Sequence, residues 1–594
     1  MIRISSYSHK DRLNFLFYFL VVLFSIILLR AFSLQVIHRQ FYKKLAEKNI
    51  IKIVFISQNR GEITDRKGNL LADNIPDYIV EIYPYLLKEE EKTLRLLSKI
   101  SFISIEKIRE KIKNAKSSFL PVIIKRHLTE SEVAKILENI TELPGVTVER
   151  KLVRNYRYGR TTSHIIGYTG ETTETEIKEN PELRENDVIG KSGLEKFYDL
   201  YMRGKPGIEY IEVDAARREV GIFKEMKSVE PEPGNGIRLT IDINLQKMVD
   251  SLFTEYKVGS VVAIEPQSGE VLILYSKPGF DPNRLVKGVS NEDLKDMLFV
   301  EGSSFWNRAI MSIYPPGSIF KIVIAAIALE NDIVKPDSRM KSCRGFLYIG
   351  NRIFNCWKRH GSLNTYEAIV QSCDVFFYQL GIKVGYSLIK EGVGGLSIFE
   401  KTGIDLPGEK KGFFPEKEWY KKRLNISYPT KGMVANLSIG QGEVLMTPLE
   451  ICSFFSSIAN YGYKITPHLV KEIKDISGNI LYKPEKTSKK MPLSDETITF
   501  LRKAMLGVVN ERGGTGAMAR INGIEVAGKT GTAENPHGED HAWFVGFAPY
   551  KNPEICVVVM LENRGHGGAV AAPVAREIIK KALGINKTYP SKTQ

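Results

Sequence analysis

A serine and a lysine three residues apart are the first residues in the chain whose types and spacing could do chemistry. Ser318 and Lys321 close the run Tyr-Pro-Pro-Gly-Ser-Ile-Phe-Lys, and the almost wholly apolar run 322–330 that follows predicts a helix. Positions three apart lie on one helix face, so the amine can reach the hydroxyl. A serine hydroxyl is a poor nucleophile until a base takes its proton. The pair therefore predicts acyl transfer, with Ser318 as nucleophile and Lys321 as base.

The spacing alone is a weak signal, because it also occurs at 104–107 and 387–390. Two later motifs supply context: Ser372-Cys373-Asp374 and Lys529-Thr530-Gly531-Thr532. The three motifs follow the order Ser-x-x-Lys, Ser-x-Asp/Asn, Lys-Thr/Ser-Gly, which is found in β-lactamases and penicillin-binding proteins. Chance explains any one of these motifs better than function does, but not all three in this order.

The surroundings of Lys529 separate it from a second Lys-Thr-Gly run at 401–403, which a turn-like segment follows. After Lys529 come two β-rich runs, 541–547 and 555–561, on either side of the turn segment 548–553. This pattern predicts that Lys529 lies on a strand beside a hairpin.

The apolar run 13–37 is the expected transmembrane anchor. As a helix it is about 37 Å long, which is enough to cross a bilayer. A cleaved signal peptide is the alternative, because Ala31-Phe32-Ser33 resembles a small-x-small cleavage site. The run is long for such a peptide, so an uncleaved anchor is favoured. Basic residues flank both ends, and the positive-inside rule does not set the orientation.

The remaining chain divides at the Pro- and Gly-rich linker 229–236. Residues 38–235 mix helical and strand-like runs and predict an α+β module. Residues 236–585 begin with a hairpin pattern around 266–269 and end in β-rich runs. We therefore expect one antiparallel sheet assembled from both ends of this domain, with helices on its faces. Segments 1–12 and 586–594 are an amino-terminal tail and a flexible carboxy-terminal tail.

The chain carries a formal net charge of +15, which suits an anionic partner. Nucleic acid, anionic lipid and an anionic cell-wall polymer all fit this charge, and the anchor favours the last two. The sequence contains no nucleic-acid-binding motif, so that class of partner is set aside.

Taken together, the motifs give a family resemblance that covers nearly the whole chain. The sequence resembles the class B, monofunctional penicillin-binding proteins, and within them the elongation type, penicillin-binding protein 2. Asp374 in the second motif also resembles the elongation type, because the division type usually has asparagine there. The segments that carry the resemblance are 60–66, 164–168, 190–195, 280–283, 288–290, 314–318, 439–442, 447–448 and 547–550.

The resemblance implies an α+β multidomain fold with a transmembrane helix at 13–37, an elongated pedestal of the dimerisation type at 38–235, and a penicillin-binding transpeptidase domain at 236–585. It implies a D,D-transpeptidase that cross-links peptidoglycan during cell elongation through a serine acyl-enzyme. Residues 1–12 would be cytoplasmic and the catalytic domain periplasmic. The substrate would be a stem peptide ending in D-Ala-D-Ala, and β-lactams would acylate the enzyme. A RodA-type glycosyltransferase and MreC-type elongation proteins are the implied partners.

The family's roles can be placed on the matched motifs. Ser318 would attack the penultimate D-Ala carbonyl, and Lys321 would be the base if burial and a nearby positive charge favour its neutral form. Ser372 would relay protons, and Asp374 would hold Lys321 or its loop. Thr530 and Thr532 would bind the substrate carboxylate beside Lys529, and the Ser318 and Thr532 N–H groups would form the oxyanion hole. Gly531 would leave room for the substrate along the strand.

The cysteines suggest a separate site. Cys343, Cys356, His360 and Cys373 have the spacing Cys-x12-Cys-x3-His-x12-Cys, and three thiolates with one imidazole suit tetrahedral zinc. Structural zinc is therefore a hypothesis, although the chemistry requires no cofactor. A Cys343–Cys356 disulfide or plain reduced thiols are the alternatives. The other two cysteines, at 452 and 556, lie in apolar runs and are expected in the core.

Two other classes of function share the three motifs. A β-lactamase or D,D-carboxypeptidase would hydrolyse the ester quickly, and the long pedestal argues against both. A β-lactam sensor or scaffold would not turn over substrate. Sensors lack this pedestal, however, and a scaffold does not need all three motifs.

Overall fold

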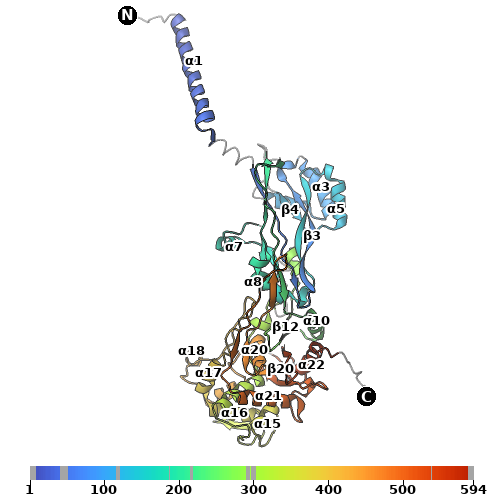
Figure 1. The fold of residues 1–594 in the computed structure, drawn as a ribbon, viewed down its shortest axis with the longest axis vertical. Coiled ribbons are helices and arrows are strands. Elements are labelled where there is room, and N and C mark those ends of the chain that lie inside the picture. Colours follow the sequence, from blue (N-terminus) through green and yellow to red (C-terminus); the bar gives the residue numbers. More distant parts are fainter. Residues whose placement is uncertain are drawn as a thin grey trace, which may run out of the picture.

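The structure is a computed structural model. It describes residues 9–40, 51–87, 89–114, 121–185, 187–213, 219–288, 303–536 and 538–585, with residues 295 and 297. The expected tail 586–594 and most of the expected amino-terminal segment 1–12 lie outside the described residues. The described chain is elongated, with one long helix at one end and the carboxy-terminal domain at the other (Figure 1).

The first helix, α1, stands apart from the rest of the molecule (Figure 1). It covers His9–Phe32 and continues into the short π-helical segment η1, Ser33–Ile37. The span Leu13–Ile37 is long and apolar enough to cross a membrane, and none of it is buried against protein. Apolar side chains around the whole circumference of a helix suit lipid better than water.

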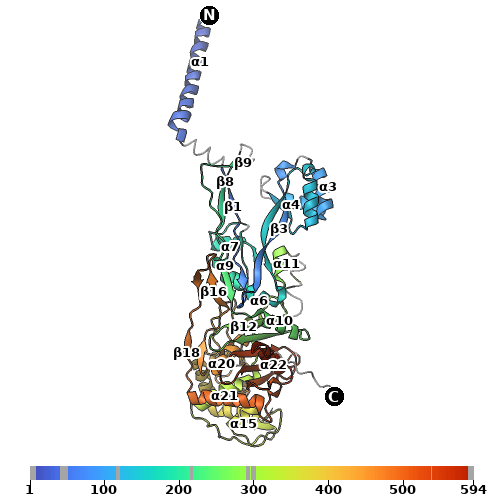
Figure 2. The same cartoon turned by 45° about the vertical axis from the view of Figure 1, so that its right-hand side comes forward.

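The pedestal has two arms that point toward α1 (Figure 2). In one arm, β8 (Gly207–Val213) pairs with β1 (Ile51–Ile56) and with β9 (Glu219–Ile222). In the other arm, β3 (Leu70–Ile82) pairs with β5 (Val146–Tyr156) along the full length of β5. The α+β module expected at this place in the chain is therefore an elongated two-armed body.

Three helices cover the second arm, and each buries one apolar stripe. They are α3 (Glu90–Ser101), α4 (Ile105–Lys113) and α5 (Glu130–Glu138), and they pack beside β4 (Val122–Lys125). The start of α5 is fixed by a reciprocal capping box between the side chains and N–H groups of Thr129 and Glu132. The other pedestal elements are η2 (Pro84–Leu86), η3 (Ile140–Glu142), η4 (Gly159–Thr161), α6 (Ser163–Ile166), β6 (Thr169–Glu171), α7 (Glu174–Glu179), β7 (Val188–Gly190), α8 (Gly193–Phe197) and α9 (Asp199–Met202).

A buried ion network holds the pedestal together at the base of its arms. The Glu195 carboxylate accepts from Arg60 Nε at 2.5 Å and from Arg154 Nε at 2.7 Å, and Arg60 also pairs with Asp199 at 2.8 Å. Burial by itself raises the pKa of Glu195, but the two arginines outweigh it and lower this pKa below its ordinary value. The network stays charged because every member has a partner.

The pedestal sheet does not stop at the expected boundary between residues 235 and 236. Strand β10 (Gly236–Leu239) pairs in parallel with β2 (Ile63–Thr64) and antiparallel with β16 (Val470–Lys474), and β17 (Ile480–Tyr482) extends the sheet. One sheet thus contains strands from both sides of the linker. Backbone hydrogen bonds therefore join the two domains directly, and the linker between them is not a flexible joint.

The carboxy-terminal domain contains the antiparallel sheet expected from its two ends. The strand order is β12 (Val271–Lys277), β11 (Gly259–Ile264), β21 (Ile555–Leu561), β20 (His541–Ala548) and β19 (Ala527–Ala533). Strand β11 pairs with β21 from the far end of the chain. The prediction of one sheet assembled from both ends is confirmed.

Helices bury both faces of this sheet. In β21, Cys556, Val558 and Met560 contribute to the cluster that contains α20 (Pro448–Ala459), and the residues between them contribute to the cluster that contains α10 (Ile243–Leu252) and α22 (Ala571–Ala582). Alternate side chains of a strand point to opposite faces. A strand covered on both faces must be apolar at every position, which explains the run Ile-Cys-Val-Val-Val-Met-Leu.

The long middle of the domain, between β12 and β19, is mainly helical and forms the lower part of Figure 1. Its main helices are α14 (Lys321–Glu330), α16 (Asp374–Val384) and α21 (Asp495–Asn510). The other elements are α11 (Pro282–Lys287), α13 (Arg308–Met311), η5 (Gly317–Phe320), β13 (Phe346–Ile349), β14 (Arg352–Asn355), α15 (Thr365–Val370), α17 (Tyr386–Gly395), α18 (Lys417–Leu424), α19 (Lys431–Ser438), β15 (Tyr463–Ile465), β18 (Ser488–Lys490) and η6 (Ala517–Ala519).

A buried histidine at the junction of the two domains predicts a pH-dependent stability. His164 Nε2 lies 2.8 Å from the Ser304 carbonyl oxygen, and burial, then Arg308, lowers the pKa of His164 to about 4. The folded protein therefore keeps this ring neutral, whereas the unfolded chain takes up a proton below about pH 6.5. The contribution of His164 to the free energy of unfolding is therefore full above pH 6.5. It falls by up to roughly 3 kcal/mol as the pH drops toward 4.

We expect His164→Gln to flatten this dependence, because glutamine can still donate to the Ser304 carbonyl but does not titrate. Melting temperatures of the two proteins between pH 7.5 and pH 4.5 provide the measurement. Parallel acid curves for wild type and variant would contradict the assignment.

Candidate active site

Ser318 lies where the apolar helix of the catalytic domain begins. It belongs to the 3-10 turn η5, and Lys321 is the first residue of α14. The pair is thus one turn apart, as predicted, although the turn is tighter than an α-helix. Gly317 before it has φ +56°, and a Cβ there would lie 2.3 Å from the Thr532 carbonyl oxygen. Glycine therefore lets the nucleophile loop touch strand β19.

Lys321 is fully buried and is held by the second motif. Its Nζ donates to Asp374 Oδ1 at 2.7 Å, to the Ser372 carbonyl at 2.9 Å and to Ser372 Oγ at 3.3 Å. Ser372 has a positive φ of 54°, which turns its loop toward the lysine. Burial raises the pKa of Asp374, although Lys321 opposes the shift. Lys321 of the first motif is therefore in direct contact with Ser372 and Asp374 of the second.

The third motif reaches the same point from the edge of the sheet. Lys529, on β19, is fully buried, and its Nζ donates to Ser372 Oγ at 2.9 Å. Burial first, and then the charge of Lys321, lowers the pKa of Lys529 well below its usual range. The Ser372 hydroxyl thus lies between two amines, and it can pass a proton from one to the other.

A cleft of about 630 Å³ opens above these groups. Its walls include Ser318, Ser372, Asp374, Thr530, Gly531 and Thr532. All the predicted catalytic and substrate-binding side chains thus line this cleft or, like the two lysines, lie buried beneath it.

The structure gives a different reason for Gly531 from the one expected. A Cβ at this position would lie 2.9 Å from the Pro316 carbonyl oxygen and 3.0 Å from side-chain carbons of Ile319 and Trp543. The crowding comes from the nucleophile loop and the neighbouring strand, so this glycine first serves the packing of η5 against β19. That this glycine also clears space for the substrate stays a prediction.

Several cleft residues belong to none of the three motifs. Trp357 Nε1 donates to the Ser372 carbonyl at 3.2 Å, and the Thr515 hydroxyl lies 2.7 Å from that of Thr530. Gln441 donates to the Thr532 carbonyl at 3.2 Å and stands in the Ile-Gly-Gln-Gly run, which was a detectable signal. Trp357 and Thr515 carried no signal in the sequence, because only the fold brings them near Ser318. The remaining non-motif wall residues are Asn355, Cys356, Tyr378, Ile439, Glu534, Asp540, His566, Gly568 and Ala569.

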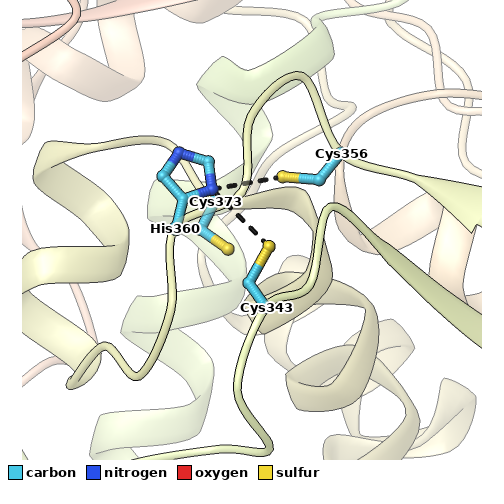
Figure 3. A group of neighbouring side chains, drawn as sticks. All are labelled: Cys343, Cys356, His360 and Cys373. Carbon is cyan, nitrogen blue, oxygen red and sulfur yellow. Dashed lines mark hydrogen bonds between the residues drawn. The ribbon is translucent and has the colours of Figure 1, made fainter.

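The cysteine and histidine residues converge as expected (Figure 3). The donor atoms of Cys343, Cys356, His360 and Cys373 all lie within 4.8 Å of one another. His360 Nδ1 is 3.7 Å from Cys343 Sγ and 3.4 Å from Cys356 Sγ, and all five cysteines of the chain have free thiols. Asp374 N–H donates to Cys356 Sγ at 3.3 Å. The cluster therefore contacts the loop that holds Lys321.

Comparison with known proteins decides the family. A family model described as the penicillin binding protein transpeptidase domain matches residues 259–580, and one described as the penicillin-binding protein dimerisation domain matches 55–239. The chain belongs to the class B penicillin-binding proteins of the PBP2 type. The pedestal of this penicillin-binding protein corresponds to the dimerisation domain of the family.

Named relatives cover nearly the whole chain. Peptidoglycan D,D-transpeptidase MrdA of Acinetobacter baumannii is 31% identical over 98% of this chain and 89% of its own length. The Escherichia coli K12 protein of the same name is 30% identical over 96% of this chain and 93% of its own length. Stage V sporulation protein D of Bacillus subtilis is 30% identical over all of this chain and 88% of its own length.

Solved structures of penicillin-binding proteins agree with this fold. The Helicobacter pylori PBP2 in complex with MreC matches with a TM-score of 0.80 at 28% identity, over 90% of this chain and all of that one. The Pseudomonas aeruginosa PBP2 in complex with WCK 5153 matches with a TM-score of 0.67 at 27% identity, over 91% of this chain and all of that one.

The repeated motifs of this penicillin-binding protein have structural roles outside the cleft. Ser104 caps α4 by accepting from the Lys107 N–H, and the Ser387 hydroxyl bonds to that of Tyr428. Thr402 of the second Lys-Thr-Gly run donates to Glu409. The residues of the three ordered motifs meet at the cleft, and their catalytic role stays a prediction.

Proposed function

We propose that the protein is a serine-type peptidoglycan D,D-transpeptidase that cross-links stem peptides during cell elongation and is acylated by β-lactams. The observation that carries this proposal is the Lys321–Ser372–Lys529 chain beneath the cleft into which Ser318 opens. The MrdA name of the relatives supports the same function.

The geometry supports a role for each residue. Ser318 attacks the penultimate D-Ala carbonyl and gives its proton to the neutral form of Lys321, and the Ser372 hydroxyl, which both amines contact, can exchange protons between Lys321 and Lys529. Ser372 then protonates the leaving D-Ala amine and takes a proton from Lys321 in return, and the ester remains on Ser318. An acceptor amine attacks this ester and forms the new amide, and the proton that it loses returns to Ser318 by the same path as the serine is released. Asp374 positions Lys321 throughout, through the 2.7 Å ion pair.

Strand β19 supplies the substrate contacts. The hydroxyls of Thr530 and Thr532 bind the carboxylate of the donor peptide beside Lys529. The Ser318 and Thr532 N–H groups stabilise the oxyanion of each tetrahedral intermediate. Thr515 supports this role, because its contact with Thr530 fixes the direction of that hydroxyl.

The test of the function is cross-linked product made from lipid-linked peptidoglycan precursor when a polymerase is present. Wild type should give dimeric stem peptides, and benzylpenicillin should abolish them. The lifetime of the penicilloyl ester separates the alternatives: hours fits a transpeptidase or a non-catalytic β-lactam sensor, and minutes fits a carboxypeptidase or β-lactamase-like hydrolase. A stable ester without any cross-linked product would favour the sensor.

We also propose the expected topology and partners. Segment 13–37 anchors the protein in the cell membrane, residues 1–12 stay in the cytoplasm, and the pedestal (38–235) and catalytic domain (236–585) are periplasmic. An MreC-type protein binds the pedestal, and a RodA-type glycosyltransferase supplies the glycan. The support comes from a related PBP2 solved with MreC and from a related chain in a peptidoglycan synthase complex.

The Cys/His cluster fits structural zinc. Thiolate and imidazole donors around one zinc ion lie roughly 3.5–3.8 Å from each other, which agrees with the 3.4 and 3.7 Å measured from His360 Nδ1. We propose that zinc bound here would fix the loop that carries Ser372 and Asp374. The chemistry itself needs no cofactor.

Purified wild type should contain about one zinc per chain, as expected for a four-ligand structural site. Cys343→Ser should lose most of this zinc and react more slowly with a fluorescent penicillin, because the Ser372 loop loses its support. Cys452→Ala is the matched control, since Cys452 lies in the core between α20 and β21, and it should keep its zinc. Wild type without stoichiometric zinc by elemental analysis would contradict the proposal.

A further inference from the structure

A short hairpin beside the cleft exposes a face that the catalytic chemistry does not use. Strands β13 and β14 pair in the register Phe346↔Asn355 and Tyr348↔Ile353. These side chains form the outer face, on which Phe346 is 39%, Ile353 55% and Tyr348 63% exposed. The rings of Phe346 and Tyr348 are 5.4 Å apart, edge to face.

The inner face of the same hairpin is already occupied. Leu347, Ile349 and Phe354 pack against the main core of the domain, as the twofold alternation of a strand requires. The Tyr378 hydroxyl also donates to the Asn355 carbonyl at 3.1 Å. The hairpin is therefore held rigidly, and its outer aromatic face is presented to solvent without being needed for folding.

This outer face is continuous with the wall of the active-site cleft. Asn355, cross-strand from Phe346, lines the cleft, and so does Trp357 two residues further along. Figure 3 shows the Cys/His cluster, whose member Cys356 also lines the cleft. Cys343 precedes β13 and Cys356 follows β14, so the cluster closes the base of the hairpin.

We propose that the outer face of the β13–β14 hairpin binds the sugar chain of the peptidoglycan strand whose stem peptide occupies the cleft. Exposed aromatic and aliphatic side chains offer a flat surface to the C–H faces of sugar rings, while Asn355 offers hydrogen bonds to their polar groups. The inference rests on the proposed function, because it takes a glycan-linked peptide as the donor.

The dimensions agree with this occupant. Each residue of an extended peptide spans roughly 3.3–3.6 Å, so a few residues between the reacting carbonyl and the sugar cover about 10–15 Å. Strand β14 advances about 10 Å from Asn355 to Arg352 at roughly 3.3 Å per residue. Because Ser318 and Asn355 line the same cleft, a stem peptide bound there can run toward the hairpin and leave its sugar on it.

The test uses the full-length protein in detergent and the double variant Tyr348→Ser/Ile353→Ser, in which both altered side chains are exposed. The probe is purified peptidoglycan glycan strands from which an amidase has removed every stem peptide. We expect wild type to bind these strands and the variant to bind at least fivefold more weakly, while fluorescent penicillin acylates both at the same rate. Tyr463→Ser, on strand β15, is the matched control and should bind like wild type.

Equal binding of the stripped strands by wild type and the double variant, or no binding by either, would overturn the inference. Weakened binding by Tyr463→Ser to the same degree would overturn it too, because the effect would then belong to exposed tyrosines in general. Penicillin labelling of wild type tests the proposed function separately. Glycan binding without labelling would therefore reject the transpeptidase assignment and leave the glycan site standing.

Discussion

Ser318→Ala should abolish acylation by a fluorescent penicillin and leave the fold unchanged. The hydroxyl is the group that forms the ester, so its removal leaves nothing to be acylated. Ser318 is only partly buried at the cleft wall, so alanine should keep the melting temperature of wild type within a few degrees. Gel fluorescence after incubation with the labelled drug provides the measurement, and we expect at least a thousandfold loss.

Ser387→Ala provides the matched control for this experiment. Ser387 stands in another Ser-x-x-Lys run of the catalytic domain, but its hydroxyl bonds to that of Tyr428 outside the cleft. This variant should label like wild type. Persistent labelling of Ser318→Ala, or loss of labelling in Ser387→Ala, would count against the assignment of the nucleophile.

Lys321→Met should slow acylation by two to four orders of magnitude, which is the usual contribution of a positioned general base. Methionine keeps much of the buried volume but cannot accept the serine proton or hold Asp374. Stopped-flow acylation by a chromogenic cephalosporin measures the rate. Lys390→Met, in the Ser-x-x-Lys run that begins at Ser387, is the control and should react at the wild-type rate.

The removal of Lys321 also leaves Asp374 without its ion-pair partner, so stability must be followed beside activity. An unpaired buried carboxylate is destabilising and tends to take up a proton. A variant that retains its melting temperature and loses acylation isolates the role of the amine. A well-folded Lys321→Met protein that acylates as fast as wild type would remove Lys321 from the mechanism.

Much of the site could be predicted from the sequence because its chemistry is local. Ser318 and Lys321 are one turn apart, and this spacing alone suggests that the lysine acts as the base for the serine. The convergence of Ser372 and Lys529 rested on family motifs, and the sheet explains it: β19 is the edge strand next to the nucleophile turn. The two-ended sheet was also predictable, since its strands had strong β-rich runs.

The residues that sequence reasoning missed depend on contacts between distant segments. Trp357 touches the Ser372 loop only because the Cys/His cluster folds the intervening chain back. The joining of β2, β10 and β16 into one sheet likewise involves strands too short to give a periodic signal. For Gly531, the sequence showed that a small residue was needed but not which neighbour required it.

The pairing of β11 with β21 also sets the order in which the protein can mature during its synthesis. A chain is made from its amino-terminal end, so β11 is complete long before β21 and has one edge unpaired until then. Non-local strand pairing is slow, and an open edge invites aggregation. The nascent polypeptide thus has no complete candidate acylation site until almost all of it has been made. A truncation that removes β21 should yield an insoluble product rather than a weak enzyme.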